Sequence, residues 1–446
     1  MNIIIAGDGE VGLYLAQALV NSNHNITIVD PQEDLLKMIE NHTDLMTIMG
    51  DSTTIEVLQR ANVRKADLVI SVVHDEHINL MTAIMAKKLG AKKVIARVNT
   101  MENLSAENWK IYQELGIDGL VSPEDIAAHE IITLLKQTAA TEVFDFSGGK
   151  LQLFMIKLEK GAPVINKSLN EIASEYKYLD FRAIAIHRKR ETFIPYGNDT
   201  FKENDLAYVI TKPEAIDNLL HLGGKVPLKI HNVMIVGGGR VGRIAAKRLE
   251  NDMNIKLIEK DKDRCILLTD YLDDALVING DARNIQLLED EDIRNIDAFI
   301  AVTNNTETNI LTCLQARTYG VKKTIALVEN IDYIDISQNI GIDTIINKKL
   351  IAASYMVRYT MGAEVTSLKC LSGIDADAME LIARPGSAVT RKLIKNLNIP
   401  EGSIIGGVVR GEDSYIAMGD FQIEENDKVV VFALPNAIHK IEKLFH

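Results

Sequence analysis

Two short apolar runs in this chain are each followed by three glycines with the same spacing. The glycines are Gly7, Gly9 and Gly12 in IIIAGDGEVG, and Gly237, Gly239 and Gly242 in MIVGGGRVG. The spacing G-x-G-x-x-G permits a tight turn, a bare backbone that a diphosphate can approach, and close contact between a strand and the next helix. Unpaired N–H groups at the helix N-terminus then bind phosphate. Both segments are therefore predicted nucleotide-binding loops.

A carboxylate ends the apolar run that follows each loop. Asp30 closes NITIVD, and Glu259 closes NIKLIE. A carboxylate at this point accepts hydrogen bonds from ribose hydroxyls and repels a 2′-phosphate, which favours NAD or an adenine nucleotide over NADP. The alternative is that both glycine-rich folds are kept only for packing.

The two halves differ at positions that a phosphate would contact. Glu10 in the first loop corresponds to Arg240 in the second, and Arg97 corresponds to Leu327. A carboxylate repels a polyphosphate whereas a guanidinium binds it, so we expect the second site to tolerate more phosphate, unless both side chains point to solvent. Arg97 is expected either over the nucleotide or at the surface.

Other polar residues also stand where helices are expected to begin. Asp51 and Asp281 each follow a glycine at the end of a third strand, and we expect them to cap the next helix, to contact adenosine, or both. The run His74–His77 (HDEH) has a spacing that metal ligands use on helices. The corresponding run in the second half is NNTE at 304–307, and polar groups are typical of a helix start, so no metal site is expected.

The composition argues against several classes of protein. The chain has 446 residues, a net charge of −13 and no apolar run near the ~20 residues that a membrane-spanning helix needs. Binding to nucleic acid would need clustered Lys and Arg. Three widely spaced cysteines give neither a disulfide framework nor a CxxC motif. We expect a cytoplasmic protein that has no secretory signal and binds no nucleic acid.

The two loops belong to a repeat that covers the chain with an offset of about 230 residues. In each half, apolar strand-like runs alternate with helical periodicity, and a smaller α+β pattern follows. The predicted fold class is therefore α/β, with two Rossmann-like doubly wound parallel sheets, each followed by a small α+β domain. The expected domains are residues 1–135, 136–224, 230–355 and 356–446.

Individual elements are also predicted. The expected strands of the first sheet are residues 2–6, 25–29, 45–48, 67–73 and 93–98. In the first small domain, residues 146–161 alternate like a strand with one solvent face, residues 168–177 are helical, and residues 181–197 contain a hairpin.

With both loops, both acids and both trailing domains, the chain resembles the TrkA family of regulatory proteins of Trk potassium uptake, which carry tandem RCK (also called KTN) units. The resemblance covers the whole chain, including KADLVISVV, NIDAFIAVT and PEGSIIGGVVRGED. It implies a regulator, not an enzyme, that binds NAD(H), ATP or ADP and self-associates into a ring. It also implies a partner, a membrane-embedded Trk potassium channel-like subunit that the regulator gates from the inner face of the membrane.

The resemblance also implies which residues bind the nucleotides. In the first half they are Gly7, Asp8, Gly9, Glu10, Val11, Asp30, Asp51, Ser52, Val72, Val73 and Arg97; in the second they are Gly237, Gly238, Gly239, Arg240, Val241, Glu259, Asp281, Ala282 and Thr303.

Two other functions stay open at this point. An NAD-dependent oxidoreductase with a duplicated Rossmann domain would need a catalytic base facing the nicotinamide, and the sequence indicates no Ser/His/Asp or Cys/His grouping. A nucleotide-sensing regulator of another transporter would bind nucleotides without associating with a Trk subunit.

If the two sites are independent, Asp30→Ala weakens binding in the first half and leaves the second nearly intact, and Glu259→Ala does the reverse. Calorimetric titration with NADH, NAD, ATP and ADP measures both effects. Equal loss at both sites in either variant would contradict independent pockets.

Overall fold

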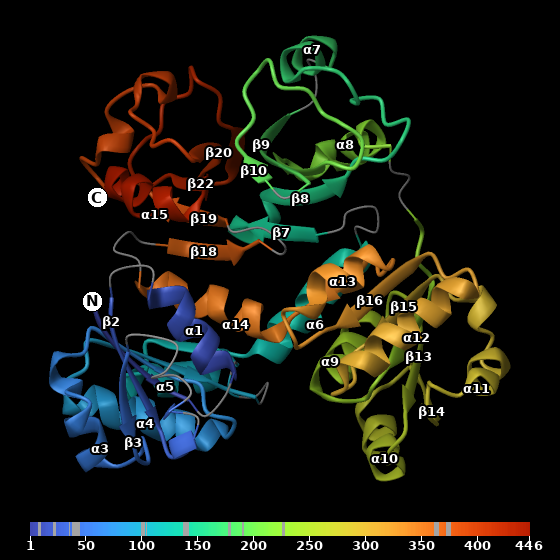
Figure 1. Cartoon of the computed structure of the whole chain (residues 1–446), viewed down its shortest axis with the longest axis horizontal. Helices are drawn as coiled ribbons and strands as arrows, with labels where there is room; N and C mark the ends of the chain where they lie inside the picture. The colour runs from blue at the N-terminus through green and yellow to red at the C-terminus, as the bar shows by residue number, and fades with distance from the viewer. Residues whose placement is uncertain are drawn as a thin grey trace. The chain divides into compact units, whose positions relative to one another are not determined.

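The computed structural model describes residues 1–7, 10–20, 24–34, 36–37, 45–99, 103, 105–136, 142–176, 180–189, 191–224, 228–360, 365–371 and 376–446 (Figure 1). The chain forms two compact units, one of Met1–Ile126 with Lys348–Met361 and one of Ala127–Asn347 with Gly362–His446. None of the described helices combines the length and the apolar character needed to cross a bilayer.

The N-terminal part is a six-stranded parallel sheet with the order β3-β2-β1-β4-β5-β6. The strands are β1 (Asn2–Ala6), β2 (Asn25–Asp30), β3 (Met46–Met49), β4 (Leu68–Ser71), β5 (Lys93–Arg97) and β6 (Gly119–Val121). The helices are α1 (Glu10–Val20), α3 (Ile55–Arg60), α4 (Glu76–Leu89), α5 (Ala106–Glu114) and α6 (Pro123–Lys136). All five expected strands are confirmed, each to within two residues at either end.

The second half repeats this sheet with the order β14-β13-β12-β15-β16-β17. The strands are β12 (Asn232–Val236), β13 (Asn254–Glu259), β14 (Leu276–Asn279), β15 (Ala298–Ala301), β16 (Lys323–Leu327) and β17 (Thr344–Ile346). The helices are α9 (Arg240–Leu249), α10 (Lys262–Tyr271), α11 (Ile285–Asp290), α12 (Thr306–Thr318), α13 (Tyr333–Asn339) and α14 (Lys348–Val357). The predicted pair of doubly wound sheets is therefore confirmed.

The parallel sheets are apolar on both faces because helices cover both faces. In β1, Ile3 and Ile5 belong to one hydrophobic cluster, while Ile4 between them belongs to another. Every residue of β4 and of β15 is buried. Side chains that alternate along a strand thus build a separate core on each face of the sheet.

One helix of the second half completes the core of the first unit. Ala352, Ala353 and Met356 of α14 share a buried cluster with Leu15 and Leu19 of α1. This helix follows the last strand of the second sheet in the sequence, yet it packs in the unit that contains the first sheet. The chain therefore passes from one unit to the other and back.

A small α+β domain follows each parallel sheet, as predicted, and each contains a five-stranded antiparallel sheet, with the orders β10-β9-β11-β8-β7 and β18-β19-β22-β20-β21. The first has β7 (Glu142–Phe146), β8 (Leu151–Lys157), β9 (Phe181–Arg188), β10 (Glu191–Phe193), β11 (Leu206–Thr211), α7 (Leu169–Glu175) and α8 (Ile216–Leu222). The second has β18 (Val365–Cys370), β19 (Asp377–Ile382), β20 (Ser403–Arg410), β21 (Asp413–Ile416), β22 (Lys428–Ala433) and α15 (Pro435–Glu442).

Two expectations for the first small domain are confirmed and one is wrong. The helix near 168–177 is α7, capped by Ser168 and Glu171, and the hairpin is β9 with β10. The strand at 146–161 was expected to have a solvent face, but β8 is buried along its whole length except Lys157. Its second face is covered because the two antiparallel sheets share one hydrophobic cluster.

Glycine allows these two antiparallel sheets to approach closely. A Cβ atom at Gly406 of β20 would lie 2.2 Å from Cδ1 of Ile210 in β11, and one at Gly407 would lie 2.6 Å from Cδ1 of Leu151 in β8. Both distances are too short for carbon atoms, so a larger residue at either position would force the facing side chain to shift.

Gly406→Ala is therefore expected to lower the free energy of unfolding by about 1–3 kcal/mol, the usual cost of overpacking. Ile210→Val removes the obstructing Cδ1, so the double variant should lose clearly less than the sum of the two single losses. Urea unfolding followed by circular dichroism measures the three variants. Strictly additive losses would show that Gly406 and Ile210 do not oppose each other.

Candidate functional site

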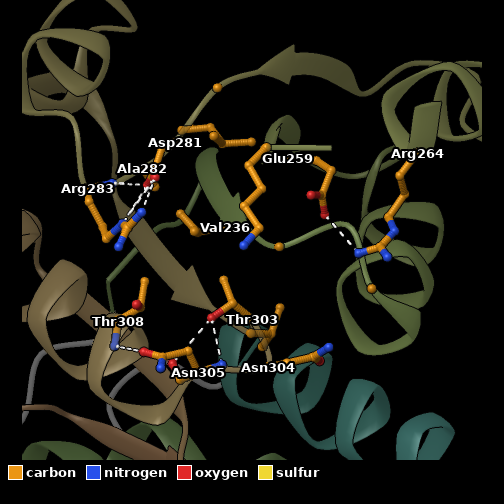
Figure 2. Close-up of a pocket in the computed structure, with 16 residues that line it drawn as sticks. Val236, Glu259, Arg264, Asp281, Ala282, Arg283, Thr303, Asn304, Asn305 and Thr308 are labelled. Atoms are coloured by element: carbon orange, nitrogen blue, oxygen red, sulfur yellow. Dashed lines mark hydrogen bonds and ion pairs between the residues drawn. The ribbon is translucent and has the colours of Figure 1, made fainter. Parts of the chain in front are cut away.

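A cavity of about 310 Å³ opens at the carboxyl ends of the strands of the second sheet (Figure 2). This size lies at the lower end of the range for small-ligand pockets. Open α/β sheets bind their ligands at this end, where the carboxyl ends of the strands meet. The lining residues are Val236, Gly237, Gly239, Ile258, Glu259, Lys260, Arg264, Gly280, Asp281, Ala282, Arg283, Val302, Thr303, Asn304, Asn305 and Thr308.

The glycine loop between β12 and α9 forms one wall of the cavity. Gly237 has a φ of +104°, which L side chains rarely adopt. A Cβ atom at Gly242 would lie only 2.0 Å from the carbonyl oxygen of Gly237. Gly239 is the N-cap of α9, and no side chain caps this helix. The first N–H groups of α9 are therefore available to an anion.

Glu259, the last residue of β13, lies against this loop. It is 4% exposed, and its Oε2 accepts a hydrogen bond of 2.8 Å from the N–H of Gly238. Oε1 accepts one of 2.9 Å from the N–H of Asp261. Nη1 of Arg264 lies 3.4 Å from Oε2 (Figure 2). The carboxylate thus holds the glycine loop.

Asp281 lies on the opposite side of the cavity and pairs with Arg283 (Figure 2). The guanidinium of Arg283, which lies 2.5 Å from Oδ2, and its backbone N–H lower the pKa of Asp281 to about 2. Asp281 is therefore ionised at neutral pH.

The expectation that Asp51 and Asp281 cap helices is wrong, because Thr54 caps α3 and Asn284 caps α11.

The buried amide of Asn309 positions Thr303, which lines the cavity. Oδ1 of Asn309 accepts hydrogen bonds from the N–H and the hydroxyl of Thr303, at 2.9 and 2.6 Å. Nδ2 donates to the carbonyl oxygens of Thr303 and Leu327, at 2.9 and 2.8 Å. Asn79 makes the equivalent bonds to the backbone of Val73 and Arg97. This amide fixes the ends of two neighbouring strands in both halves.

The first half arranges several predicted residues in the same way. Gly7 follows β1, and Glu10 and Val11 begin α1. Asp30 is buried at the end of β2, where its Oδ1 accepts a hydrogen bond from the N–H of Gln32. Asp8 and Gly9 lie outside the described residues, as does the side chain of Glu10.

The remaining first-half residues follow the next strands. Oδ1 of Asp51 accepts hydrogen bonds from the N–H and the hydroxyl of Thr53, and Ser52 is hydrogen-bonded to Thr82. Val72 and Val73 follow β4. Arg97 is not the surface residue expected as one alternative, because its side chain is only 12% exposed and lies 3.0 Å from Glu124; its place over a nucleotide stays a prediction.

Six of the nine residues predicted in the second half line the cavity: Gly237, Gly239, Glu259, Asp281, Ala282 and Thr303. Gly238 contributes its N–H to Glu259 instead. Arg240 is exposed and Val241 is buried in the core; neither lines the cavity.

Sequence reasoning missed the basic residues of the cavity. Lys260, Arg264 and Arg283 line it, and each lies one to five residues after a predicted acid. A search of the loops that follow Glu259 and Asp281 for basic residues would have found them, because those loops share the carboxyl edge of the sheet.

The run His74–His77 starts a helix. Asp75 is the N-cap of α4 and accepts a hydrogen bond from the N–H of His77, while Glu76 accepts one from the N–H of Asn99. No group of three His, Cys, Asp or Glu side chains within the described ranges is arranged to hold a metal ion.

A doubly wound sheet with a glycine-rich loop and an acid at the end of the next strand defines the Rossmann class of domains, and this chain carries two such sheets. Comparison with known proteins then identifies the family. The TrkA-N domain family matches residues 3–123 and 233–348, and the TrkA-C domain family matches residues 153–222 and 378–446. The chain belongs to the TrkA family of Trk system potassium uptake proteins.

Similar proteins cover the whole chain. "Trk system potassium uptake protein TrkA" of Halomonas elongata is 31% identical over 450 residues, covering 100% of this chain and 98% of that protein. "Trk system potassium uptake protein TrkA homolog 1" of Methanosarcina mazei is 31% identical over 455 residues, covering 100% of both. The solved structure "GsuK channel bound to NAD" shares the fold, with a TM-score of 0.63 and 18% identity over 100% of this chain and 78% of that one.

Replacing Asn309 by Leu, which has a similar size, should leave buried backbone groups of Thr303 and Leu327 without partners. Since each such group costs about 1–3 kcal/mol, the free energy of unfolding should fall by about 2–4 kcal/mol. The exposed Asn304→Leu serves as the control and should change it by less than about 0.5 kcal/mol. Chemical unfolding curves decide; equal effects of the two variants would refute the structural role of the amide.

Proposed function

We propose that this chain is the nucleotide-sensing regulatory subunit of a Trk-type potassium uptake system. It binds NAD(H), ATP or ADP at the carboxyl ends of its parallel sheets. It acts from the cytoplasmic side on a membrane-embedded, potassium-translocating subunit. The observation that carries the proposal is the uncapped N-terminus of α9, which faces the cavity beside the carboxylate of Glu259.

The cavity suits a nucleotide at both of its ends. Free N–H groups and the positive end of the α9 dipole favour phosphate at the glycine loop. Glu259 offers acceptors for ribose hydroxyls, as Asp30 does in the first half. Solved relatives of the same fold are described as bound to NAD and as bound to ADP. Both ligand types are therefore proposed for this chain.

Regulation follows from binding alone, with no catalytic step. A ligand shifts an equilibrium between two shapes only by the difference between its affinities for them. A change from mostly closed to mostly open requires about 5 kcal/mol of such difference. Several chains in a ring, each with two sites, would share that requirement. We therefore propose self-association into a ring that docks on the membrane subunit.

A carboxylate introduced at the helix N-terminus tests the phosphate site. A Cβ atom at Gly239 would contact nothing within 4 Å, and Asp is a favourable N-cap residue, so Gly239→Asp should fold normally. Its charge repels phosphate and its side chain occupies the free N–H groups. Relative to the neutral Gly239→Asn, it should weaken binding of ATP and NADH to the second site at least tenfold, corresponding to ~1.4 kcal/mol.

Calorimetry of the two Gly239 variants measures this difference, and the ligand should be recovered unchanged after titration. Equal affinities of both variants for ATP would mean that phosphate does not bind at α9. Conversion of NADH during the titration would instead favour an oxidoreductase.

A further inference from the structure

Arg264 occupies a position in the second half that the glycine pattern does not predict. Oε2 of Glu259 binds both the N–H of Gly238, at 2.8 Å, and Nη1 of Arg264, at 3.4 Å. Because both groups reach the same oxygen atom, the guanidinium lies alongside the glycine loop. Figure 2 shows Arg264 beside Glu259, at the side of the cavity opposite Arg283. A cation is thus held where the loop would receive phosphate.

The bond between Arg264 and Glu259 is one that a ligand can replace. Its length of 3.4 Å exceeds the usual range for charge-assisted hydrogen bonds. The Arg264 side chain is 47% exposed, whereas that of Glu259 is 5% exposed. An ion pair so open to solvent contributes little to stability. Phosphate oxygens offer a guanidinium two parallel hydrogen bonds instead of this single long one.

Helix α10 fixes the direction of the side chain. Asp261 caps this helix and accepts hydrogen bonds from the N–H groups of Asp263 and Arg264. Arg264 is therefore in the first helical turn, directly after the strand that ends in Glu259. Its neighbour Cys265 is buried against the carbonyl oxygen of Glu259, which keeps the first turn of α10 close to the cavity.

The first half has no equivalent cation. When Asp30 is aligned with Glu259, Leu35 corresponds to Arg264 and Pro31 corresponds to Lys260. Leu36 and Cys265 then correspond as well, and both are buried, which supports the alignment. The two halves thus share the loop and the acid but differ in charge beside them.

We propose that Arg264 makes the second site selective for phosphate charge. In the chain without ligand, its guanidinium neutralises Glu259. When a nucleotide binds, the guanidinium turns to the phosphate and Glu259 accepts the ribose hydroxyls. The second site therefore prefers ATP and ADP strongly over adenosine, and the first site prefers them less. This inference rests on the proposed nucleotide binding.

Amide hydrogen exchange of the full chain distinguishes the two sites, because peptides from residues 233–249 report on the second loop and peptides from residues 2–19 on the first. Titrations with ATP and with adenosine give an affinity ratio for each loop. Arg264→Leu, which introduces the first-half residue, should lower the ATP-to-adenosine ratio at the second loop roughly tenfold to a hundredfold. Arg264→Lys, which keeps the charge but loses the paired hydrogen bonds, should fall in between.

Lys262→Leu is the matched control, since it removes the same charge from the same turn of α10 at a residue that does not line the cavity. In this variant the ATP-to-adenosine affinity ratio at the second loop should stay within about twofold of the wild-type ratio, as expected for a screened surface charge. An unchanged ratio in Arg264→Leu, or an equal fall in Lys262→Leu, would overturn the role of Arg264. If the wild-type chain shows no protection by ATP at either loop, the proposed nucleotide binding itself fails.

Discussion

The close approach of a strand to the helix that follows it is the constraint on which the site depends. Gly242 lies so near the carbonyl oxygen of Gly237 that any side chain would collide with it. This contact brings the uncapped end of α9 to the carboxyl edge of the sheet, where the loops after β13, β14 and β15 also end. Glu259 then holds the glycine loop through the N–H of Gly238. The proposed contacts to phosphate and to ribose therefore lie in one cavity.

The two halves of the chain have the same backbone fold but different charged side chains near the carboxyl ends of their strands. Asn79 and Asn309 fix equivalent strand ends with equivalent hydrogen bonds. The cations differ, since Arg97 pairs with the buried Glu124 in the first half while Arg264 and Arg283 line the cavity in the second. Under the proposed function, two sites built on the same kind of sheet would differ in the nucleotide that they prefer.

Much of the fold and several residues of the candidate site could be predicted from the sequence, because they depend on local spacing. The glycines, the acids Asp30 and Glu259 and the parallel strands all follow from periodicity and composition. The contact of Arg264 with Glu259 could not be predicted, because it depends on a carboxylate oxygen that also accepts the N–H of Gly238. The buried second face of β8 and the packing of α14 in the first unit depend on long-range contacts, which the amphipathic pattern of a strand or helix does not specify. The N-caps of α3 and α11 lie three residues later than predicted, at Thr54 and Asn284. A turn separates Asp51 and Asp281 from these helices, and the sequence pattern did not reveal it.

Potassium flux into vesicles that contain the membrane-embedded Trk subunit, with this chain added, tests the central claim most directly. Flux should change when ATP or NADH is added with the wild-type chain. With Gly239→Asp the response mediated by the second site should be lost, while Gly239→Asn retains it in part. A flux that nucleotides do not alter, or that responds equally with all three chains, would contradict regulation through a nucleotide bound at the α9 loop.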